Sequence, residues 1–211
     1  GSVATAFVVV MVAWPLAAIL RRGLAPAGSF DLSPISESLA SDRTAAIVRF
    51  TFLQAFLSTV VTLVLGVPAA WSVARPWWGR GTVHALAAAA FVLPTVVMGL
   101  AWRAVVDRGL GAIVLAHAAF NVAIVVQVLG VAWARLDPHP AEAARTLGAS
   151  RMRAWWTIDR PRLVAPFVGS VLLVFLFSFT SFGVVVILGD ARRGTIETEI
   201  ARLSRGLQFD R

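Results

Sequence analysis

Five long runs without a charged side chain dominate this 211-residue sequence and limit the structures open to it. They cover residues 3–20, 50–74, 82–102, 109–134 and 163–189, and each is between 18 and 27 residues long. A helix needs about 20 apolar residues to cross the hydrocarbon core of a bilayer. The sequence therefore predicts an all-α polytopic membrane protein, with about five spans in one transmembrane domain over residues 1–211.

The composition excludes several other classes of protein. Hydrophobic residues make up 58% of the chain and charged residues 14%, outside the usual range of a water-soluble domain. The chain has no cysteine, so a disulfide or a cysteine-ligated metal is excluded. All 19 basic residues are arginines in short segments between or beyond the apolar runs, where topology signals lie. The net charge of +8 is therefore explained by the topology signals of a multi-pass membrane protein and does not indicate a nucleic-acid-binding protein.

The ends of the chain and the prolines inside the runs affect how the five predicted spans are interpreted. Arg21 and Arg22 follow the first run instead of preceding it, which favours a retained span over a signal peptide. Pro68, Pro94 and Pro166 lie inside runs, and membrane helices tolerate proline, often with a kink. The chain starts without methionine and ends in a polar stretch, so we expect both ends to be incomplete.

Arginine placement predicts the orientation in the membrane. Residues 135–162 hold six arginines against three acids, and the turn near Arg75 and Arg80 has no acid. Both segments are therefore expected on the cytoplasmic side. The connector over residues 21–49 is rich in serine and proline and carries balancing acids, so we expect it on the outer side.

Residues 135–162 predict a helix, a break and a second short helix outside the bilayer. Asp137 and the two prolines after it suit a helix start, and Glu142 can pair with Arg145 on the next turn. Gly148 allows either a turn or the close approach of another backbone. From charge and periodicity alone, the segment suits binding to anionic lipid headgroups as well as it suits docking to a protein.

The spacing within this segment resembles a family motif. It is similar to the EAA loop of the permease subunits of ATP-binding-cassette (ABC) importers, which forms the coupling helices that insert into a groove of the cytoplasmic ATPase. The positions that match the motif are Glu142, Ala143, Ala144, Gly148, Ile158 and Pro161. Arg145 and Arg151 are candidates for supporting this coupling role, and Arg160 departs from the motif, which usually has an apolar residue before the proline.

Further segments extend the resemblance over nearly the whole chain. "RFTFLQAFLS", "LAHAAFN", "SFTSFGVVVILGD" and "TIETEIARL", in this order, resemble the amino-terminal half of the fused permeases that import thiamine or ferric iron, with thiamine the nearer. The resemblance implies a type I importer domain with cytoplasmic coupling helices. It also implies three partners: a cytoplasmic ABC ATPase dimer that uses ATP and magnesium, an extracytoplasmic solute-binding protein, and a second permease half, either fused or separate.

Polar side chains inside the runs are candidates for a translocation path, because hydrocarbon penalises them unless they face protein or water. They are Gln54, His117, Asn121 and Gln127. His117 and Asn121 are four residues apart and share a helical face, whereas Gln127 lies about ninety degrees from it. Hydrogen bonding between helices is the commoner use of such residues. The hydroxyls at 178, 180 and 181, with Gly183, mark a place where a helix loosens or packs closely.

The sequence offers little support for a catalytic or metal-binding function. No GxSxG, HExxH or phosphate-binding GxxxxGK[ST] motif occurs, so we expect a non-enzymatic chain that binds no cofactor or metal, with ATP hydrolysed by another subunit. An ATP-independent secondary transporter is the alternative from another class. Such proteins usually couple transport through carboxylates inside the membrane, and every run here lacks Asp and Glu. The interpretation we favour is an importer that works by alternating access.

Overall fold

The computed structural model describes residues 2–24, 36–37, 40–190 and 194–206, and every regular element in these ranges is a helix. The expected all-α class is therefore confirmed for the described part of the chain, whereas much of the connector over 21–49 lies outside the described residues. The α-helices and two π-helical turns longer than two residues are α1 (Ser2–Leu24), α3 (Asp42–Val73), α4 (Arg80–Val92), α5 (Thr95–Arg103), α6 (Leu110–Val125), η1 (Val126–Gly130), α7 (Val131–Ala134), α8 (His139–Thr146), α9 (Arg151–Ala154), η2 (Trp155–Asp159), α10 (Arg160–Phe179), α11 (Gly183–Leu188) and α12 (Ile196–Gly206).

The chain divides into two compact units, Gly1–Ala46 and Ile47–Arg211. Helix α1 belongs to the first unit and corresponds to the first uncharged run. Its apolar side chains are exposed, with Phe7, Trp14 and Ile19 all more than half accessible. Such a surface suits a helix whose surroundings are lipid or another protein segment.

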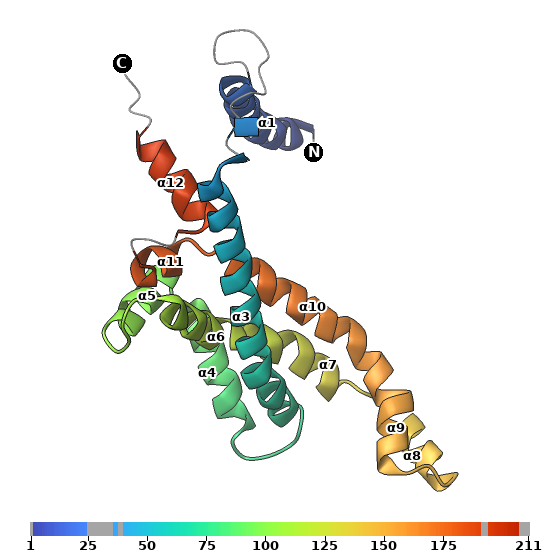
Figure 1. The fold of residues 1–211 in the computed structure, drawn as a ribbon. Helices are drawn as coiled ribbons and strands as arrows, with labels where there is room; N and C mark the ends of the chain where they lie inside the picture. Colours follow the sequence, from blue (N-terminus) through green and yellow to red (C-terminus); the bar gives the residue numbers. More distant parts are fainter. Residues whose placement is uncertain (1, 25–35, 38–39, 191–193, 207–211) are drawn as a thin grey trace. The chain divides into compact units, whose positions relative to one another are not determined.

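Three helical stretches are long and apolar enough to cross a membrane among the described residues. They are Asp42–Val73, Leu110–Ala134 and Arg151–Phe179. These stretches coincide with the uncharged runs at 50–74 and 109–134 and with most of the run at 163–189. Figure 1 shows them as the long elements labelled α3, α6 with α7, and α9 with α10.

Two runs do not form the continuous spans that the sequence predicts. The run at 82–102 is divided between α4 and α5, and the backbone at Leu93 is extended, with φ −65° and ψ 134°. Pro94 has no N–H group and disfavours a helical conformation in the residue before it, which accounts for the break. The run at 163–189 is interrupted between Phe179 and Gly183, where α10 ends and α11 begins.

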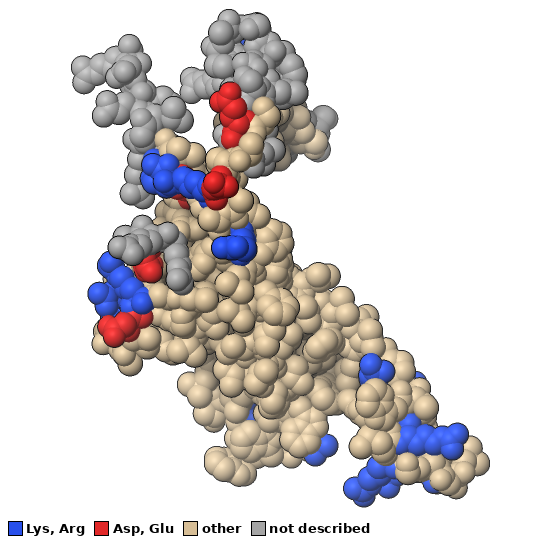
Figure 2. All heavy atoms as spheres, in the orientation of Figure 1, with Lys and Arg blue, Asp and Glu red and all other residues tan. Residues whose placement is uncertain are grey.

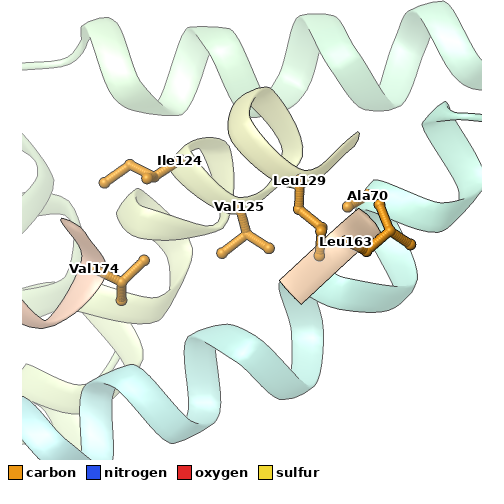
Figure 3. Close-up of a cluster of buried hydrophobic side chains, with 6 residues drawn as sticks. All are labelled: Ala70, Ile124, Val125, Leu129, Leu163 and Val174. Carbon is orange, nitrogen blue, oxygen red and sulfur yellow. The ribbon is translucent and has the colours of Figure 1, made fainter. Parts of the chain in front are cut away.

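Helix α6 is the centre of the second unit. Figure 3 shows Ile124 and Val125 of α6 and Leu129 of η1 among side chains from α3 and α10, namely Ala70, Leu163 and Val174. A second cluster joins the first half of α6 to α11, and a third joins its second half to α4. The bundle therefore assembles by packing around α6.

Helix α3 meets α6 through a stripe of small and polar residues. The buried positions along it share a helical face and are Thr51, Gln54, Ala55, Ser58, Thr59, Thr62, Gly66 and Ala70. Larger side chains such as Phe56 and Val64 lie on its exposed face. Small residues let membrane helices approach closely, and a β-carbon added to Gly66 would lie 2.8 Å from the Val125 Cβ.

The arginine-bearing connectors expected on one side of the membrane do lie at one end of the second unit. In Figure 1 the turn after α3 and the segment of α8 and α9 are both at the end where α10 begins. Figure 2 shows blue arginine atoms at both ends: around α8 and α9 no red acidic atoms accompany them in this view, whereas at the opposite end they lie beside red atoms, and the surface along α10 is largely uncharged. This distribution agrees with the positive-inside rule for a cytoplasmic end.

Candidate functional site

The candidate coupling segment, residues 135–162, begins with a turn at Asp137, and the next residue, Pro138, is the N-cap of helix α8. The carboxylate of Asp137 accepts a hydrogen bond from the His139 backbone N–H at 3.1 Å and lies 2.6 Å from the His139 ring Nδ1. Helix α8 follows, with two prolines near its start as the sequence predicts. Its position outside the apolar spans and its exposed surface leave it open to a partner.

Charge pairing makes Asp137 and His139 sensitive to pH. The hydrogen bond between them lowers the pKa of Asp137 and raises the pKa of His139 above 6.5. The stabilisation from protonated His139 is fully present below pH 6.5, the ordinary pKa of histidine. It is lost as the pH rises through the raised pKa of His139. On the acid side it is lost as the pH falls through the lowered pKa of Asp137.

Asp137→Asn is expected to move the His139 pKa down towards 6.5, because the amide removes the main hydrogen-bonding and charge effects. The measurement is an NMR titration of the His139 imidazole protons. Glu142→Gln is the matched control, since the Glu142 charge contributes least to the raised pKa and should produce a smaller shift. An unchanged His139 pKa in Asp137→Asn would contradict the assigned pairing.

Gly148 ends α8 by turning the chain. Its N–H donates to the Arg145 carbonyl at 3.0 Å, and the Ala149 N–H donates to the Ala144 carbonyl at 3.0 Å. This pair of bonds is the Schellman arrangement, whose glycine takes a left-handed conformation. Gly148 has φ +91°, and no atom lies within 4 Å of an added β-carbon. Of the two roles the sequence left open for Gly148, the structure therefore shows the turn.

The matched EAA positions sit on this segment with few internal partners. Glu142 and Arg145 are both exposed, and no ion pair joins them within the described residues, so the predicted pair is not formed. Ala143 is exposed and Ala144 is half-buried on the same helix. Next to them Leu147 is 89% exposed and presents an apolar side chain outside the predicted spans.

The second half of the segment differs from the predicted short helix. Ser150 caps α9 by accepting the Arg153 N–H at 3.2 Å, and Arg151 is exposed. Helix α9 then continues through η2 into α10 as one stretch, Arg151–Phe179. The wider π-helical turn contains Ile158, half-buried, and immediately precedes the turn that holds Pro161. A proline inside a regular α-helix would clash with the carbonyl four residues earlier, and the π-helical turn provides the extra room.

Arg160 has a surface position that explains its departure from the family motif. Its guanidinium lies 4.5 Å from the centre of the Trp156 ring, and both side chains are exposed. The neighbouring Trp155 stacks on Trp133 at 5.5 Å between ring centres. A cation over an aromatic ring at a membrane surface is stable without a buried pocket.

Three of the four candidate path residues come together inside the bundle. Gln54 Nε2 donates to the Ser178 carbonyl at 2.9 Å, and Asn121 Nδ2 donates to the Ser178 hydroxyl at 3.1 Å. His117 Nδ1 is 3.2 Å from the Ser58 hydroxyl. Gln127 is exposed on η1 and lies outside this group. The polar group links α3, α6 and α10, as expected for hydrogen bonding between membrane helices.

The same group borders a cavity of about 400 Å³. His117 and Asn121 line it from α6, and the break between α10 and α11 supplies Thr180 and Ser181. The sequence left two roles open for these residues, loosening of a helix or close packing, and the structure shows both: the helix is interrupted here, and a β-carbon added to Gly183 would lie 2.8 Å from Thr95 Oγ1. The partner Ser58 was missed, although its place on the small-residue stripe of α3 was the available signal.

Relatives with assigned roles match most of this chain, although no protein-family model does. The sulfate transport system permease protein CysT of Escherichia coli is 30% identical over 194 residues, which cover 82% of this chain and 70% of CysT. The molybdenum transport system permease protein ModB of Azotobacter vinelandii is 30% identical over 168 residues, covering 71% and 74%. The thiamine transport system permease protein ThiP of Brucella melitensis is 28% identical over 187 residues, covering 78% of this chain and 34% of ThiP.

A solved structure supports the fold. It is a bacterial ABC transporter that imports the acidic polysaccharide alginate, with a TM-score of 0.66 and 19% identity. The match covers 86% of this chain and 66% of that chain, so the chain spans just under two thirds of its structural neighbour. With the sequence relatives, this similarity confirms the expected resemblance, and the chain belongs to the permease family of ABC importers.

Proposed function

We propose that this chain is the channel-forming subunit of an ATP-driven importer and that residues 135–162 dock to its ATPase. The observation that carries the docking is the geometry of α8 and the Gly148 turn. Glu142, whose carboxylate has no ion-pair partner among the described residues, lies on a short helix outside the spans, and the 89% exposed Leu147 follows directly after this helix. An acidic group beside an apolar anchor on a rigid helix suits insertion into a groove of a partner protein.

The partners follow from this role. A chain of this family is a multi-pass protein of the inner membrane, and the ATPase is a separate subunit. We assign to this chain a cytoplasmic ABC ATPase dimer, which uses ATP and magnesium, an extracytoplasmic solute-binding protein and a second permease half. Arg145 on α8 and Arg151 at the start of α9 are exposed and support the docking by contacts with the ATPase or with lipid headgroups.

We assign thiamine, or a thiamine phosphate, as the solute. Sequence identity alone does not separate this from sulfate or molybdate, since the relatives named for the three solutes are 28% to 30% identical. What supports thiamine is the resemblance of three sequence segments to thiamine permeases, and these segments also contact one another in the bundle. Thr51 of "RFTFLQAFLS" accepts the Ile196 N–H of "TIETEIARL" at 3.2 Å, and Ser58 contacts His117 of "LAHAAFN". A ferric-iron permease of the same architecture is the second candidate.

The mechanism we propose is alternating access. Closure of the ATPase dimer moves the docked segment, and rocking of the two permease halves opens the path first outward and then inward. Membership of the ABC importer permease family disfavours the alternative of another class, an ATP-independent secondary transporter. The lack of Asp and Glu in the predicted spans favours the ATP-driven mechanism, because ion-coupled transporters usually hold carboxylates there.

The test is uptake into vesicles that contain the full-length permease, its ATPase and its binding protein. Radiolabelled thiamine, ferric iron, sulfate and molybdate are compared with and without ATP. We expect ATP-dependent accumulation of thiamine alone. Uptake of another of these solutes would overturn the thiamine assignment, and uptake without ATP would overturn the importer mechanism.

A further inference from the structure

The cavity beside the polar group has two buried polar atoms that nothing in the described chain satisfies. They are His117 Nε2 and Asn121 Oδ1, and the two side chains are 2% and 1% exposed. Both residues line the cavity from one face of α6. Buried polar atoms in native proteins are nearly always hydrogen-bonded, so this pair calls for a partner in the cavity.

The two atoms define the hydrogen-bonding character of that partner. Asn121 donates its amide N–H to Ser178, and its Oδ1 is left as an acceptor. The Ser58 hydroxyl is hydrogen-bonded to His117 Nδ1, so Nε2 is the ring nitrogen left to bind a ligand. Nε2 is a donor when Ser58 donates to Nδ1, and an acceptor in the other tautomer. A ligand with an N–H donor beside a second polar ring atom can satisfy both side chains.

The residues that line the cavity indicate the shape and charge of the ligand that it could bind. Four phenylalanines line it, Phe91, Phe120, Phe177 and Phe182, and Phe91 stacks on Phe120 with ring centres 5.2 Å apart. Among the described residues, none that lines the cavity is an arginine, a lysine or an acid. Phenyl rings stack on flat rings and attract cations through their faces. A sulfate or molybdate dianion would lose its hydration there and meet no cationic group.

We propose that this cavity recognises a planar nitrogen heteroaromatic ring of the transported solute, neutral or cationic, which stacks on the phenylalanines and hydrogen-bonds to His117 and Asn121. This inference rests on the proposed function and deepens it, because it places solute recognition inside this half of the permease. A volume of about 400 Å³ lies within the range of small-molecule sites.

The experiment measures binding to the full-length permease with its ATPase in lipid nanodiscs, without the binding protein and without ATP. The probe is radiolabelled thiamine, with 4-aminopyrimidine and sulfate as competitors. We expect saturable binding that 4-aminopyrimidine displaces and sulfate does not. Asn121→Leu should weaken binding about tenfold, as expected for the loss of one buried hydrogen bond.

Two further variants separate recognition from folding. Ser181→Trp places a large ring at the cavity lining, within the break between two helices, and leaves the Asn121–Ser178 bond intact, so it should abolish binding without unfolding the bundle. Thr62→Val is the matched control: this buried hydroxyl of α3 bonds only its own helix, at the Ser58 carbonyl, and does not line the cavity. Its binding should equal that of the wild type.

The outcomes distinguish this inference from the proposed function. If the wild type takes up thiamine with ATP but Asn121→Leu and Ser181→Trp bind it normally, the cavity assignment is overturned and the importer function stands. If the wild type takes up no thiamine, the proposed solute is wrong, and displacement studies with a labelled aminopyrimidine then test the cavity alone. Displacement by sulfate would overturn the heteroaromatic assignment.

Discussion

Gly148→Val is expected to lower ATP-driven uptake about tenfold or more while the permease remains inserted in the membrane. Gly148 holds φ +91°, and a left-handed conformation costs an L-residue roughly 1–2 kcal/mol, with a β-branched side chain at the unfavourable end. A strain of this size shifts an equilibrium by about 5- to 30-fold away from the turn. The ATPase should continue to hydrolyse ATP, and the ratio of solute imported to ATP hydrolysed is the measurement.

Gly81→Val is the matched control for this variant. Gly81 also has open space around an added β-carbon, but it lies in α4 without a positive φ, so the change introduces no comparable strain. Gly148→Asn should fall between the two, since asparagine tolerates left-handed conformations better than valine. Normal coupled uptake in Gly148→Val would refute the docking role of the turn.

Gly66→Leu is expected to prevent stable assembly of the bundle. The added β-carbon would lie 2.8 Å from the Val125 Cβ at the crossing of α3 and α6, closer than two carbons can pack. Overpacking a filled core typically costs about 1–3 kcal/mol, and here the remaining atoms of leucine add to the overlap. Thermal unfolding in detergent, followed by size-exclusion chromatography, measures the loss.

Gly169→Leu on α10 controls for the change of residue type. An added β-carbon there meets nothing within 4 Å, and the substitution removes a glycine from a helix interior, so stability should be unchanged or slightly higher. If both variants unfold at the same temperature as the wild type, the close approach of α3 and α6 is not a determinant of the fold.

The apolar pattern predicted the helices better than it predicted their continuity. Pro68 and Pro166 lie inside intact helices, as expected, whereas Pro94 separates α4 from α5. The sequence offered the same signal in all three places. Whether a proline bends a membrane helix or ends it depends on which neighbouring groups satisfy the freed carbonyl, and those neighbours come from distant parts of the chain.

The candidate sites show the same limit: features set by neighbouring residues could be predicted, and contacts between different helices could not. Capping and the α8 turn are local, so Asp137 and Gly148 could be read from neighbouring residues. The shared face of His117 and Asn121 also follows from helical spacing. Their partners Ser58 and Ser178 lie on other helices, and spacing along one helix cannot identify them. Nor could the outward position of Gln127 be fixed, because the π-helical turn at Val126–Gly130 changes the rotation per residue.

One helical stretch, Arg151–Phe179, extends from the proposed docking segment to a wall of the cavity. At about 1.5 Å per residue its 29 residues span roughly 43 Å, more than the thickness of the hydrocarbon core. Phe177 lies near one end of this stretch and Trp156 near the other, and the helix continues between them through the π-helical turn at Trp155–Asp159 and past Pro161 and Pro166. In the docking that we propose, a movement of the ATPase would therefore act on the cavity wall through this one helical stretch.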